Sequence, residues 1–374
     1  KRSKIVIARG SELFVDGGQL TSLDNFPWHG IEVWGNSNQS QLVTQQGWVR
    51  VINGGTIENS NMGIYTNRPL EMADSGWEPG YTGGIVQAID AKFINNKTAL
   101  QFFPYNFPSV SGFTNCEFIT NLSYPGSQPP DYFAKITGMN GVKFSHCNFV
   151  NETGIDYYQS GIRSVNSYIK IEGKCLDASQ PCTNWEYSLF EGLKYGIYAT
   201  ATGPTRFVDI RHTEFDNNFR GLYLSGITNA RVTSNRFIIN TPFAEEGGYG
   251  LYLDASTGYW IEDNDFLHEH EGEIQKGIGL IVNNSGSAPN EIYRNRFENL
   301  QMGISAQGRN RHPVANQGLQ ILCNDFTVCQ ADLLVVAPLP DKTKFDGIAP
   351  KQGAAMPNNP MAMAGNMFHV YNQP

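Results

Sequence analysis

Tyrosines recur at a fixed place after a glycine, in a pattern that suits sugar recognition. Tyr198, Tyr223 and Tyr252 each follow a glycine and an aliphatic residue in three successive segments of the chain. A tyrosine offers an apolar ring that can stack on a sugar and a hydroxyl that can hydrogen-bond to it. Asp254 would share their face in a strand, because alternate strand residues point the same way. We therefore predict a carbohydrate-binding strip of Tyr198, Tyr223, Tyr252 and Asp254, with strand propensity and like-on-like stacking as the alternative explanation of the tyrosines.

The densest group of candidate metal ligands is the run from His268 to Glu273. In an extended chain His268 and His270 would point to one side, which is a spacing that metal ions accept. An acidic loop in contact with solvent explains the same run without a metal. The only cofactor that the sequence leaves open is a divalent cation at His268 and His270.

Enzymes that cleave glycans need either two carboxylates beside the scissile bond or a cation together with a strong base. Asp263 and Asp265 would share a strand face, but arginines neighbour Asp265 in the repeat described below. No Gly-x-Ser-x-Gly nucleophile signature is present in the sequence. The sequence therefore favours a non-enzymatic module that acts as a stalk, an adhesin or a binding scaffold. A polysaccharide lyase or glycoside hydrolase is the alternative.

Four of the six cysteines form two closely spaced pairs. Cys175 and Cys182 lie seven residues apart in one insertion, and Cys323 and Cys329 lie six residues apart around one repeat. We predict a local disulfide in each pair, which would place the chain in an oxidising compartment.

Phenylalanines mark a repeat along the chain, and this repeat positions the candidate residues. They recur at intervals of 22 to 42 residues and are Phe93, Phe118, Phe149, Phe190, Phe215, Phe237, Phe266, Phe297, Phe326 and Phe368. A period of this size with loop insertions is typical of a solenoid. Neither the apolar period of helical repeats nor a dense leucine frame is present, so these two solenoid classes are disfavoured.

Small or polar residues stand two positions before each marker and should share the inner face of the strand. They are Cys116, Cys147, Ser188, Thr213, Asn235, Asn264, Asn295, Asn324 and Asn366. We expect each asparagine amide to bond to the next along the axis, and Cys116 and Cys147 to stack as buried thiols. Asparagines after the marker suit bends, because asparagine tolerates left-handed backbone angles; these are Asn59, Asn95, Asn151, Asn217 and Asn299. The pattern predicts an all-β fold, a parallel β-helix of about 11–12 coils with rungs ~4.8 Å apart.

The residue directly before the marker should face outward. In five successive repeats it is Glu214, Arg236, Asp265, Arg296 and Asp325, so acids and bases alternate. Rungs at strand spacing would place each acid beside a base, which predicts a surface ladder of ion pairs.

Composition and charge limit the partners. The chain has 374 residues, 40% hydrophobic and 17% charged, with a net charge of −8 and no basic stripe, so we expect no nucleic-acid partner. No apolar run is long enough to predict a membrane span. We expect one β-helix domain over residues 1–374, with an irregular, proline-rich excursion at 337–365, and we expect this domain to be part of a longer chain.

The repeat frame resembles the right-handed parallel β-helix superfamily, the pectate-lyase-like fold, over almost the whole chain. The runs at 30–36, 249–254, 290–297 and 322–326 look like the β-helix region of large bacterial surface proteins exported by type IX secretion. The resemblance implies a right-handed solenoid at an extracellular or cell-surface location, and it transfers no catalytic residue, because fold does not imply function. The expected partners are a polysaccharide or another surface protein. Because open solenoid ends expose strand edges, end-to-end self-association into an extracellular fibre is a further alternative.

Overall fold

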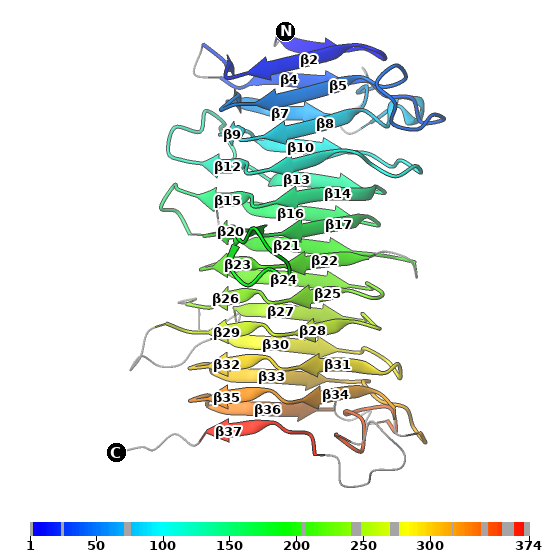
Figure 1. The fold of residues 1–374 in the computed structure, drawn as a ribbon, viewed down its shortest axis with the longest axis vertical. Helices are drawn as coiled ribbons and strands as arrows, with labels where there is room; N and C mark the ends of the chain where they lie inside the picture. Colours follow the sequence, from blue (N-terminus) through cyan, green and yellow to red (C-terminus); the bar gives the residue numbers. More distant parts are fainter. Residues whose placement is uncertain are drawn as a thin grey trace. The chain divides into compact units, whose positions relative to one another are not determined.

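The computed structural model describes residues 3–369 except 24–25, 71–75, 157, 204–206, 241–247, 270–276, 316, 338–342 and 354–362. The chain divides into two compact units, residues 1–198 and 199–374, and the division falls within β21 (Tyr195–Thr200). In each unit three parallel sheets run along the stack, here called sheets A, B and C (Figure 1). The fold is a right-handed parallel β-helix of about 11–12 coils, as the sequence predicted.

Unit 1 repeats one coil, in which a strand of sheet A is followed by one of sheet B and one of sheet C. Sheet A contains β1 (Lys4–Ile7), β4 (Trp28–Val33), β7 (Ser60–Tyr65), β10 (Thr98–Phe102), β13 (Tyr132–Thr137) and β16 (Ser160–Val165). Sheet B contains β2 (Glu12–Asp16), β5 (Trp48–Ile52), β8 (Ile85–Ile89), β11 (Gly112–Thr114), β14 (Asn140–Ser145) and β17 (Tyr168–Glu172). Sheet C contains β3 (Gln19–Leu20), β6 (Thr56–Glu58), β9 (Lys92–Ile94), β12 (Glu117–Thr120), β15 (Asn148–Asn151) and β20 (Ser188–Glu191).

Two small elements of unit 1 lie outside these sheets. They are the 3₁₀ turn η1 (Pro79–Tyr81) and the antiparallel hairpin of β18 (Lys174–Cys175) and β19 (Trp185–Glu186). Within the described residues, no helix is long and apolar enough to cross a membrane.

Unit 2 repeats the same coil. Sheet A contains β24 (Arg220–Ser225), β27 (Tyr249–Asp254), β30 (Ile278–Asn283), β33 (Met302–Gln307) and β36 (Ala331–Val336). Sheet B contains β22 (Val208–Arg211), β25 (Arg231–Thr233), β28 (Trp260–Glu262), β31 (Asn290–Tyr293) and β34 (Leu319–Leu322). Sheet C contains β23 (Thr213–Asp216), β26 (Arg236–Ile238), β29 (Asp265–Leu267), β32 (Arg296–Glu298), β35 (Asp325–Thr327) and β37 (Met367–His369).

The predicted phenylalanine column is present in each unit. In unit 1 the rings of Phe93, Phe118, Phe149 and Phe190 stack nearly parallel, with successive centroids 4.8, 4.5 and 4.5 Å apart. In unit 2 the column runs from Phe215 to Phe368, with successive centroids 4.6 to 5.3 Å apart. All these rings are buried except that of Phe368, which is 53% exposed. The core is therefore a stack of aromatic rungs that opens at the last coil.

The glycine before each tyrosine run makes room for this column. An ideal Cβ placed on Gly250 would lie 2.8 Å from the carbonyl oxygen of Gly279 and 2.8 Å from the Phe266 ring. Real Cβ atoms do not approach so closely, so only glycine fits between the sheet A backbone and the rings. In the Gly-aliphatic-Tyr frame, the glycine is thus required by core packing, and the tyrosine two residues later points outward.

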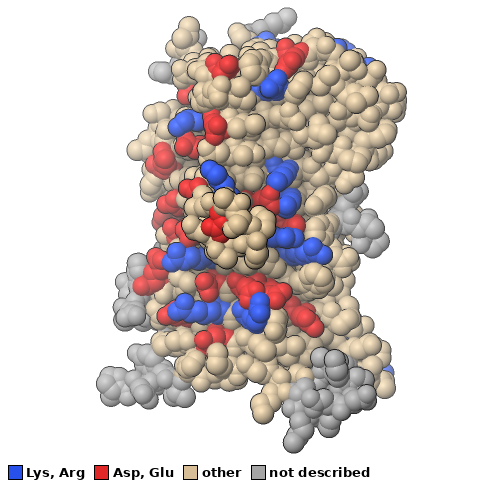
Figure 2. All heavy atoms as spheres, in the orientation of Figure 1, with Lys and Arg blue, Asp and Glu red and all other residues tan. Residues whose placement is uncertain are grey.

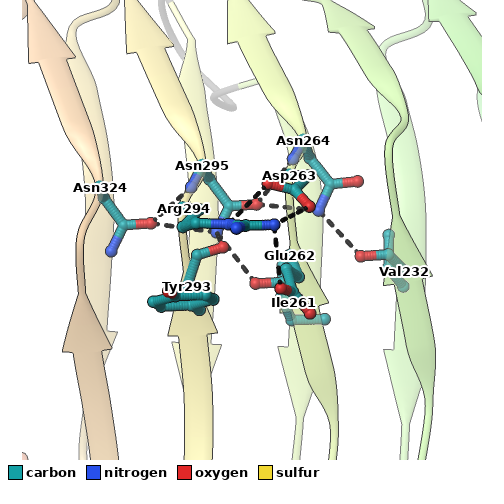
Figure 3. A network of polar contacts seen from close by, with 9 residues as sticks. All are labelled: Val232, Ile261, Glu262, Asp263, Asn264, Tyr293, Arg294, Asn295 and Asn324. Carbon is teal, nitrogen blue, oxygen red and sulfur yellow. Dashed lines mark hydrogen bonds and ion pairs between the residues drawn. The ribbon is translucent and has the colours of Figure 1, made fainter. Parts of the chain in front are cut away.

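The predicted asparagine ladder forms inside unit 2 (Figure 3). Asn264 Nδ2 donates to Asn295 Oδ1 at 2.9 Å and to the Val232 carbonyl oxygen at 2.8 Å. Asn295 in turn donates to Asn324 Oδ1 at 3.1 Å and to the Ile261 carbonyl oxygen at 3.0 Å. Each buried amide therefore finds its partners in the neighbouring coil and sheet, which fixes the register of the stack.

The bends follow the prediction in part. Asn59, Asn95, Asn217 and Asn299 have φ values of 51° to 58°, the left-handed region that asparagine tolerates. Asn151 instead ends β15 and donates through Nδ2 to the carbonyl oxygens of Ile155 and Gly192.

The outward charges form a less regular ladder than expected. Arg236 pairs with Glu214 at 3.2 Å, as predicted, and also with Glu269 at 3.2 Å. Arg296 pairs with Glu298 of its own strand rather than with an acid of the next coil. Since an exposed arginine has several acids within reach, strict alternation along the column does not decide its partner.

Candidate functional site

The outer side of sheet A in unit 2 carries two of the predicted tyrosines side by side. Parallel pairing of β24 with β27 places Tyr223 opposite Tyr252 and Ser225 opposite Asp254. The rings of Tyr223 and Tyr252 lie 5.3 Å apart at a tilt of 41°, and Tyr249 lies 5.4 Å from Tyr252. This tyrosine face, defined as Tyr223, Tyr249, Tyr252 and Asp254, presents the partly exposed rings of Tyr223 and Tyr252 in neighbouring coils, with the buried ring of Tyr249 beside that of Tyr252.

Asp254 is the polar centre of the tyrosine face. Its Oδ2 accepts hydrogen bonds from the Tyr223 hydroxyl at 3.1 Å and from Ser225 Oγ at 3.0 Å. Its Oδ1 accepts one from Asn283 Nδ2 at 2.9 Å. A carboxylate has about four acceptor sites, so these three bonds hold Asp254 in place and leave capacity for a ligand hydroxyl.

The electrostatics keep the phenol of Tyr252 protonated. Burial raises its pKa above the usual value of 10, and the nearby Asp254 carboxylate raises it further, against a smaller opposing effect from Asn283. At neutral pH Tyr252 is therefore a neutral donor and acceptor beside a fixed carboxylate acceptor, which is a combination that suits sugar hydroxyls.

Tyr198 belongs to unit 1, where its ring contacts that of Tyr195. Its ring lies 5.2 Å from that of Tyr195 in the same strand, in an edge-on arrangement. Nearby, the Arg163 guanidinium lies 5.9 Å from the ring centre of Tyr132, whose pKa is raised chiefly by burial. The structure thus brings Tyr223, Tyr252 and Asp254 together in unit 2, and within unit 1 it places Tyr198 beside Tyr195.

The sheet A strands of the tyrosine face carry a single carboxylate. Among the strands β24, β27, β30 and β33, Asp254 is the only residue with a carboxylate. Glycosidases of the usual type need two carboxylates across the scissile bond. This face can stack on rings and exchange hydrogen bonds, and it lacks an acid–base pair on its own strands.

Asp263 and Asp265 do not form a carboxylate pair on one strand face. Asp263 has a φ of 55° and lies in the bend between β28 and β29, outside both strands. Its carboxylate binds the Arg294 guanidinium in a two-pronged contact of 3.0 and 2.7 Å (Figure 3). Asp265 is half-buried, and burial raises its pKa, while Arg296 and Arg236 act in the opposite sense. The expectation that these two acids share a face is therefore wrong.

Of the two predicted metal ligands, only His268 lies in the part of the chain that the structure describes. His268 is buried, and its Nδ1 lies 3.1 Å from the Ile239 carbonyl oxygen. His270 lies outside the described residues, so the histidine site stays a prediction. The one group of three or more close ligand side chains among the described residues is Cys175, Asp177 and Cys182.

The first predicted disulfide is present, and it joins the two cysteines of that group. Cys175 and Cys182 are bonded, with their Cα atoms 6.0 Å apart, in the hairpin loop of β18 and β19. Asp177 Oδ2 accepts hydrogen bonds from the Thr183 backbone N–H and hydroxyl and from the Asn184 N–H, which close the loop. These contacts lower the Asp177 pKa. A sulfur in a disulfide is not a thiolate ligand, so the loop is a cross-link in this state.

The second predicted disulfide is absent, because Cys323 and Cys329 are both free. The strand β35 (Asp325–Thr327) extends between them, and three strand residues alone span ~10 Å. A disulfide needs Cα atoms about 4.4 to 6.8 Å apart, which the extended strand prevents. Cys116 and Cys147 are buried free thiols, as the ladder position predicted.

Sequence reasoning missed an exposed aromatic residue on sheet B. Trp260 begins β28 and is 54% exposed, and the contact of Asp263 with Arg294 lies in the bend that follows the strand. The available signal was its place in the repeat, five residues before the Asp265 position, where β25 and β31 carry Arg231 and Glu291. Strand alternation in this frame places Trp260 outward, because it directly precedes the core residue Ile261.

Comparison with known proteins identifies one family. A family model described as NosD, periplasmic copper-binding protein, matches residues 134–330, which is more than half of the chain. No curated protein sequence matches the chain.

Solved structures offer only remote similarity. The catalytic domain of a GH87 alpha-1,3-glucanase in complex with tetrasaccharides is 12% identical, with a TM-score of 0.31, over 98% of this chain and 64% of that chain. The same type of domain in complex with nigerose is 11% identical, with a TM-score of 0.26, over 89% of this chain and 60% of that chain. The chain thus spans less than two thirds of these structures, and the likeness is too low to support an activity.

Proposed function

The chain belongs to the family described as periplasmic copper-binding protein (NosD), and from that premise we propose that it works outside the cytoplasm as a non-enzymatic β-helix module. Its role is to present a rigid sheet to a polysaccharide, which binds along the tyrosine face of unit 2. The observation that carries this role is the network in which Tyr223, Ser225 and Asn283 hold the Asp254 carboxylate beside two partly exposed tyrosine rings.

Two findings support a location outside the cytoplasm. The family is described as periplasmic, and the described hairpin loop contains a disulfide. Disulfides form and persist in oxidising compartments such as the periplasm and the extracellular space. Anchoring at the cell surface, an adhesive role and export by type IX secretion are finer proposals that rest on the resemblance of the repeat.

The binding mode follows from rigid positioning. The tyrosines stand on a sheet whose register is fixed by the asparagine ladder, so they lose little freedom when a ligand stacks on them. Tyr252 donates or accepts as a neutral phenol, and Asp254 accepts from a sugar hydroxyl. A polymer that lies along the axis of the β-helix, perpendicular to the strands, passes one outward-facing side chain in each coil.

Copper binding is a second candidate function, because the family description names it. Copper ions in proteins take thiolate, thioether or imidazole ligands. Among the described residues, the only close group of three or more His, Cys, Asp or Glu side chains is Cys175, Asp177 and Cys182, and its sulfurs are bonded to each other. This group therefore does not fit a resident copper ion, and we derive no step through one.

A polysaccharide lyase or glycoside hydrolase remains the enzymatic alternative. It would place its reaction beside Asp254, because this is the carboxylate of the tyrosine face. A surface protein as partner, and end-to-end association into a fibre, are further proposals. The apolar side chains of Leu334, Val335 and Val336 on β36 are 39% to 42% exposed, and they favour contact with a further strand.

Affinity electrophoresis through gels that contain laminarin, mannan, dextran or hydroxyethylcellulose tests the proposed function. We expect retardation in at least one gel, and we expect Tyr252→Ala to reduce it several-fold because the stacked ring and its hydroxyl are lost. Tyr168→Ala, which removes a partly exposed tyrosine from sheet B of unit 1, is the matched control and should migrate like the parent protein.

Turnover is measured on the same polymers through new reducing ends and through unsaturated products. The proposal predicts neither product with the parent protein. Product formation that disappears in Asp254→Asn would replace it with the enzymatic alternative. Retardation that is equal in Tyr252→Ala and the parent protein would remove the tyrosine face from the binding role.

A further inference from the structure

An exposed indole stands on the outer side of sheet B in unit 2, away from the sheet A strands of the tyrosine face. Trp260 is 54% exposed, although the next residue, Ile261, is fully buried in the core. A large aromatic side chain in water forgoes the burial that usually stabilises it. The residues around Trp260 therefore decide whether the exposed indole can form part of a binding site.

Parallel pairing gives Trp260 one neighbour in each adjoining coil. Arg231 of β25 lies opposite it on one side and Glu291 of β31 on the other. The Arg231 guanidinium lies 4.6 Å from the indole centre, which is within range of a cation–π contact. The contact orients the ring, so the indole is a fixed platform rather than a free rotor.

The adjoining positions carry paired charges and a second ring. Arg294 binds Asp263 at 2.7 Å and Glu262 at 3.4 Å, and its guanidinium lies 5.1 Å from the Tyr293 ring centre. The side chains of Arg294, Asp263 and Glu262 are 51%, 42% and 36% exposed, respectively. Figure 2 shows acidic and basic side chains gathered together over β25, β28 and β31. Glu262 and Tyr293 thus lie two residues along their strands from Trp260 and Glu291, and the pair of Asp263 and Arg294 lies in the bends that follow.

The charge balance selects the class of ligand. Two arginines, Arg231 and Arg294, face three acids, Glu262, Asp263 and Glu291, so the surface is close to neutral and mixed in sign. A polyanion would meet the acids, and a basic peptide would meet the arginines. A neutral glycan avoids both conflicts, because its apolar ring faces stack on aromatics while its hydroxyls donate and accept.

We propose that sheet B of unit 2 carries a second binding site, the Trp260 platform, formed by Arg231, Trp260, Glu262, Tyr293 and Arg294. Its ligand is a neutral polysaccharide that stacks one sugar on Trp260 and lies along the coils, whose spacing of ~4.8 Å is about the length of one sugar ring. Arg294 donates to hydroxyls of the neighbouring sugar, and Glu262 accepts from them. The platform and the tyrosine face lie on different sheets, so each can be removed without the other.

Titration with hexasaccharides separates the two sites, because such short ligands do not bridge them as a polymer can. The probes are laminarihexaose, cellohexaose, mannohexaose and maltohexaose, with the hexamer of galacturonic acid as the anionic comparison. Isothermal titration gives affinity and stoichiometry for the parent protein, Trp260→Ala, Arg294→Gln and Tyr252→Ala. Phe26→Ala, which removes another exposed aromatic side chain in unit 1, is the matched control.

We expect Trp260→Ala to weaken one class of site by roughly tenfold or more, the change that ~1.4 kcal/mol represents. Arg294→Gln should weaken the same class by a smaller factor, and Phe26→Ala should leave both classes unchanged. Subtracting the emission spectrum of Trp260→Phe from that of the parent protein gives the emission of Trp260. This emission should shift when the protein is saturated with the bound hexaose, which reports contact at the indole itself.

Three results would overturn the proposal. They are unchanged affinity and stoichiometry in Trp260→Ala, loss confined to Tyr252→Ala, and preference for the galacturonate hexamer over every neutral probe. The second result would leave the proposed function intact and remove only the Trp260 platform. Loss confined to Trp260→Ala would instead move the binding role from the tyrosine face to sheet B.

Discussion

Asn264 and Asn295 are 31 residues apart in sequence, yet the Asn264 amide donates to the Asn295 side-chain oxygen at 2.9 Å inside the core of unit 2. The same Asn295 oxygen also accepts the Asn264 backbone N–H at 3.0 Å. One side chain thus satisfies both the main chain and the side chain of the coil before it. This relationship is the structural basis of the repeat, and it leads to the first prediction.

Asn264→Ala should lower the free energy of unfolding by about 2–3 kcal/mol, because buried partners in two neighbouring coils lose their hydrogen bonds at ~1–3 kcal/mol each. Asn366→Ala is the control, since Asn366 is the last member of the ladder and is only half-buried. It should cost less. Urea unfolding monitored by far-UV circular dichroism measures both, and equal losses would show that the ladder does not act as a continuous network.

Gly250→Ala should destabilise the protein by about 1–3 kcal/mol, because its Cβ would overlap the Gly279 carbonyl oxygen and the Phe266 ring. Gly203→Ala is a matched control, since a Cβ there meets no atom within 4 Å. The control should change stability by less than about 0.5 kcal/mol. Thermal unfolding of the two variants under identical conditions tests the packing role of the glycine frame.

Glu32 should contribute to stability only above the acidic range. Burial opposes ionisation of this carboxyl, but bonds from His29, Lys4 and Trp34 outweigh burial and hold its pKa below 4.5. A folded-state pKa below the unfolded value gives stability that is present above the unfolded pKa and is lost as pH falls through the folded one. Glu32→Gln should therefore destabilise at pH 7 by about 1–3 kcal/mol and approach the parent protein below pH 4.

The pH test for Glu32 compares urea midpoints from pH 3 to pH 7. The difference between the parent protein and Glu32→Gln should shrink steadily below about pH 4.5. A constant difference across the range would show that the charge of Glu32 is not the source of its contribution.

Thiol labelling should separate the four free cysteines. Cys323 is exposed and should react with a maleimide in the native protein, whereas Cys116 and Cys147 are buried and should react only after unfolding. Burial also raises the pKa of Cys329 to about 11, which lowers its thiolate fraction at neutral pH and should slow its reaction. Mass spectrometry of peptides labelled before and after denaturation provides the measurement. Rapid native labelling of Cys147 would contradict the packing of the ladder.

Period and residue type were sufficient to predict the coil, the Phe297 column and the Asn295 ladder, because these features repeat in every turn and face a uniform core. The outer surface was less predictable. Whether Arg296 pairs along the column or within its strand depends on side-chain reach, which spacing does not encode. The bend at Asp263 was also missed, because the spacing of the markers does not fix where a strand ends. The strand at Phe326, by contrast, was part of the predicted repeat, and it already argued against a disulfide between Cys323 and Cys329.

The tyrosine face was predicted in part. Tyr223, Tyr252 and Asp254 follow from strand alternation, which fixes the face that each residue occupies. Trp260 holds an outward place of the same alternation, but how much of its side chain is exposed depends on which loops cover the sheet. Loops are irregular in sequence, so the repeat carries no information about them.

The open aromatic stack at Phe368 has a consequence for how the protein comes apart. A linear array of coils is held together by contacts between neighbours, so a coil with fewer partners has the smallest local opening energy. Strand β37 has Phe368 53% in water, and its backbone should exchange amide hydrogens well before that of β32, where Phe297 is sealed between two rings. If unfolding starts at this coil and proceeds inward, each coil should resist force and proteolysis more strongly the farther it lies from β37.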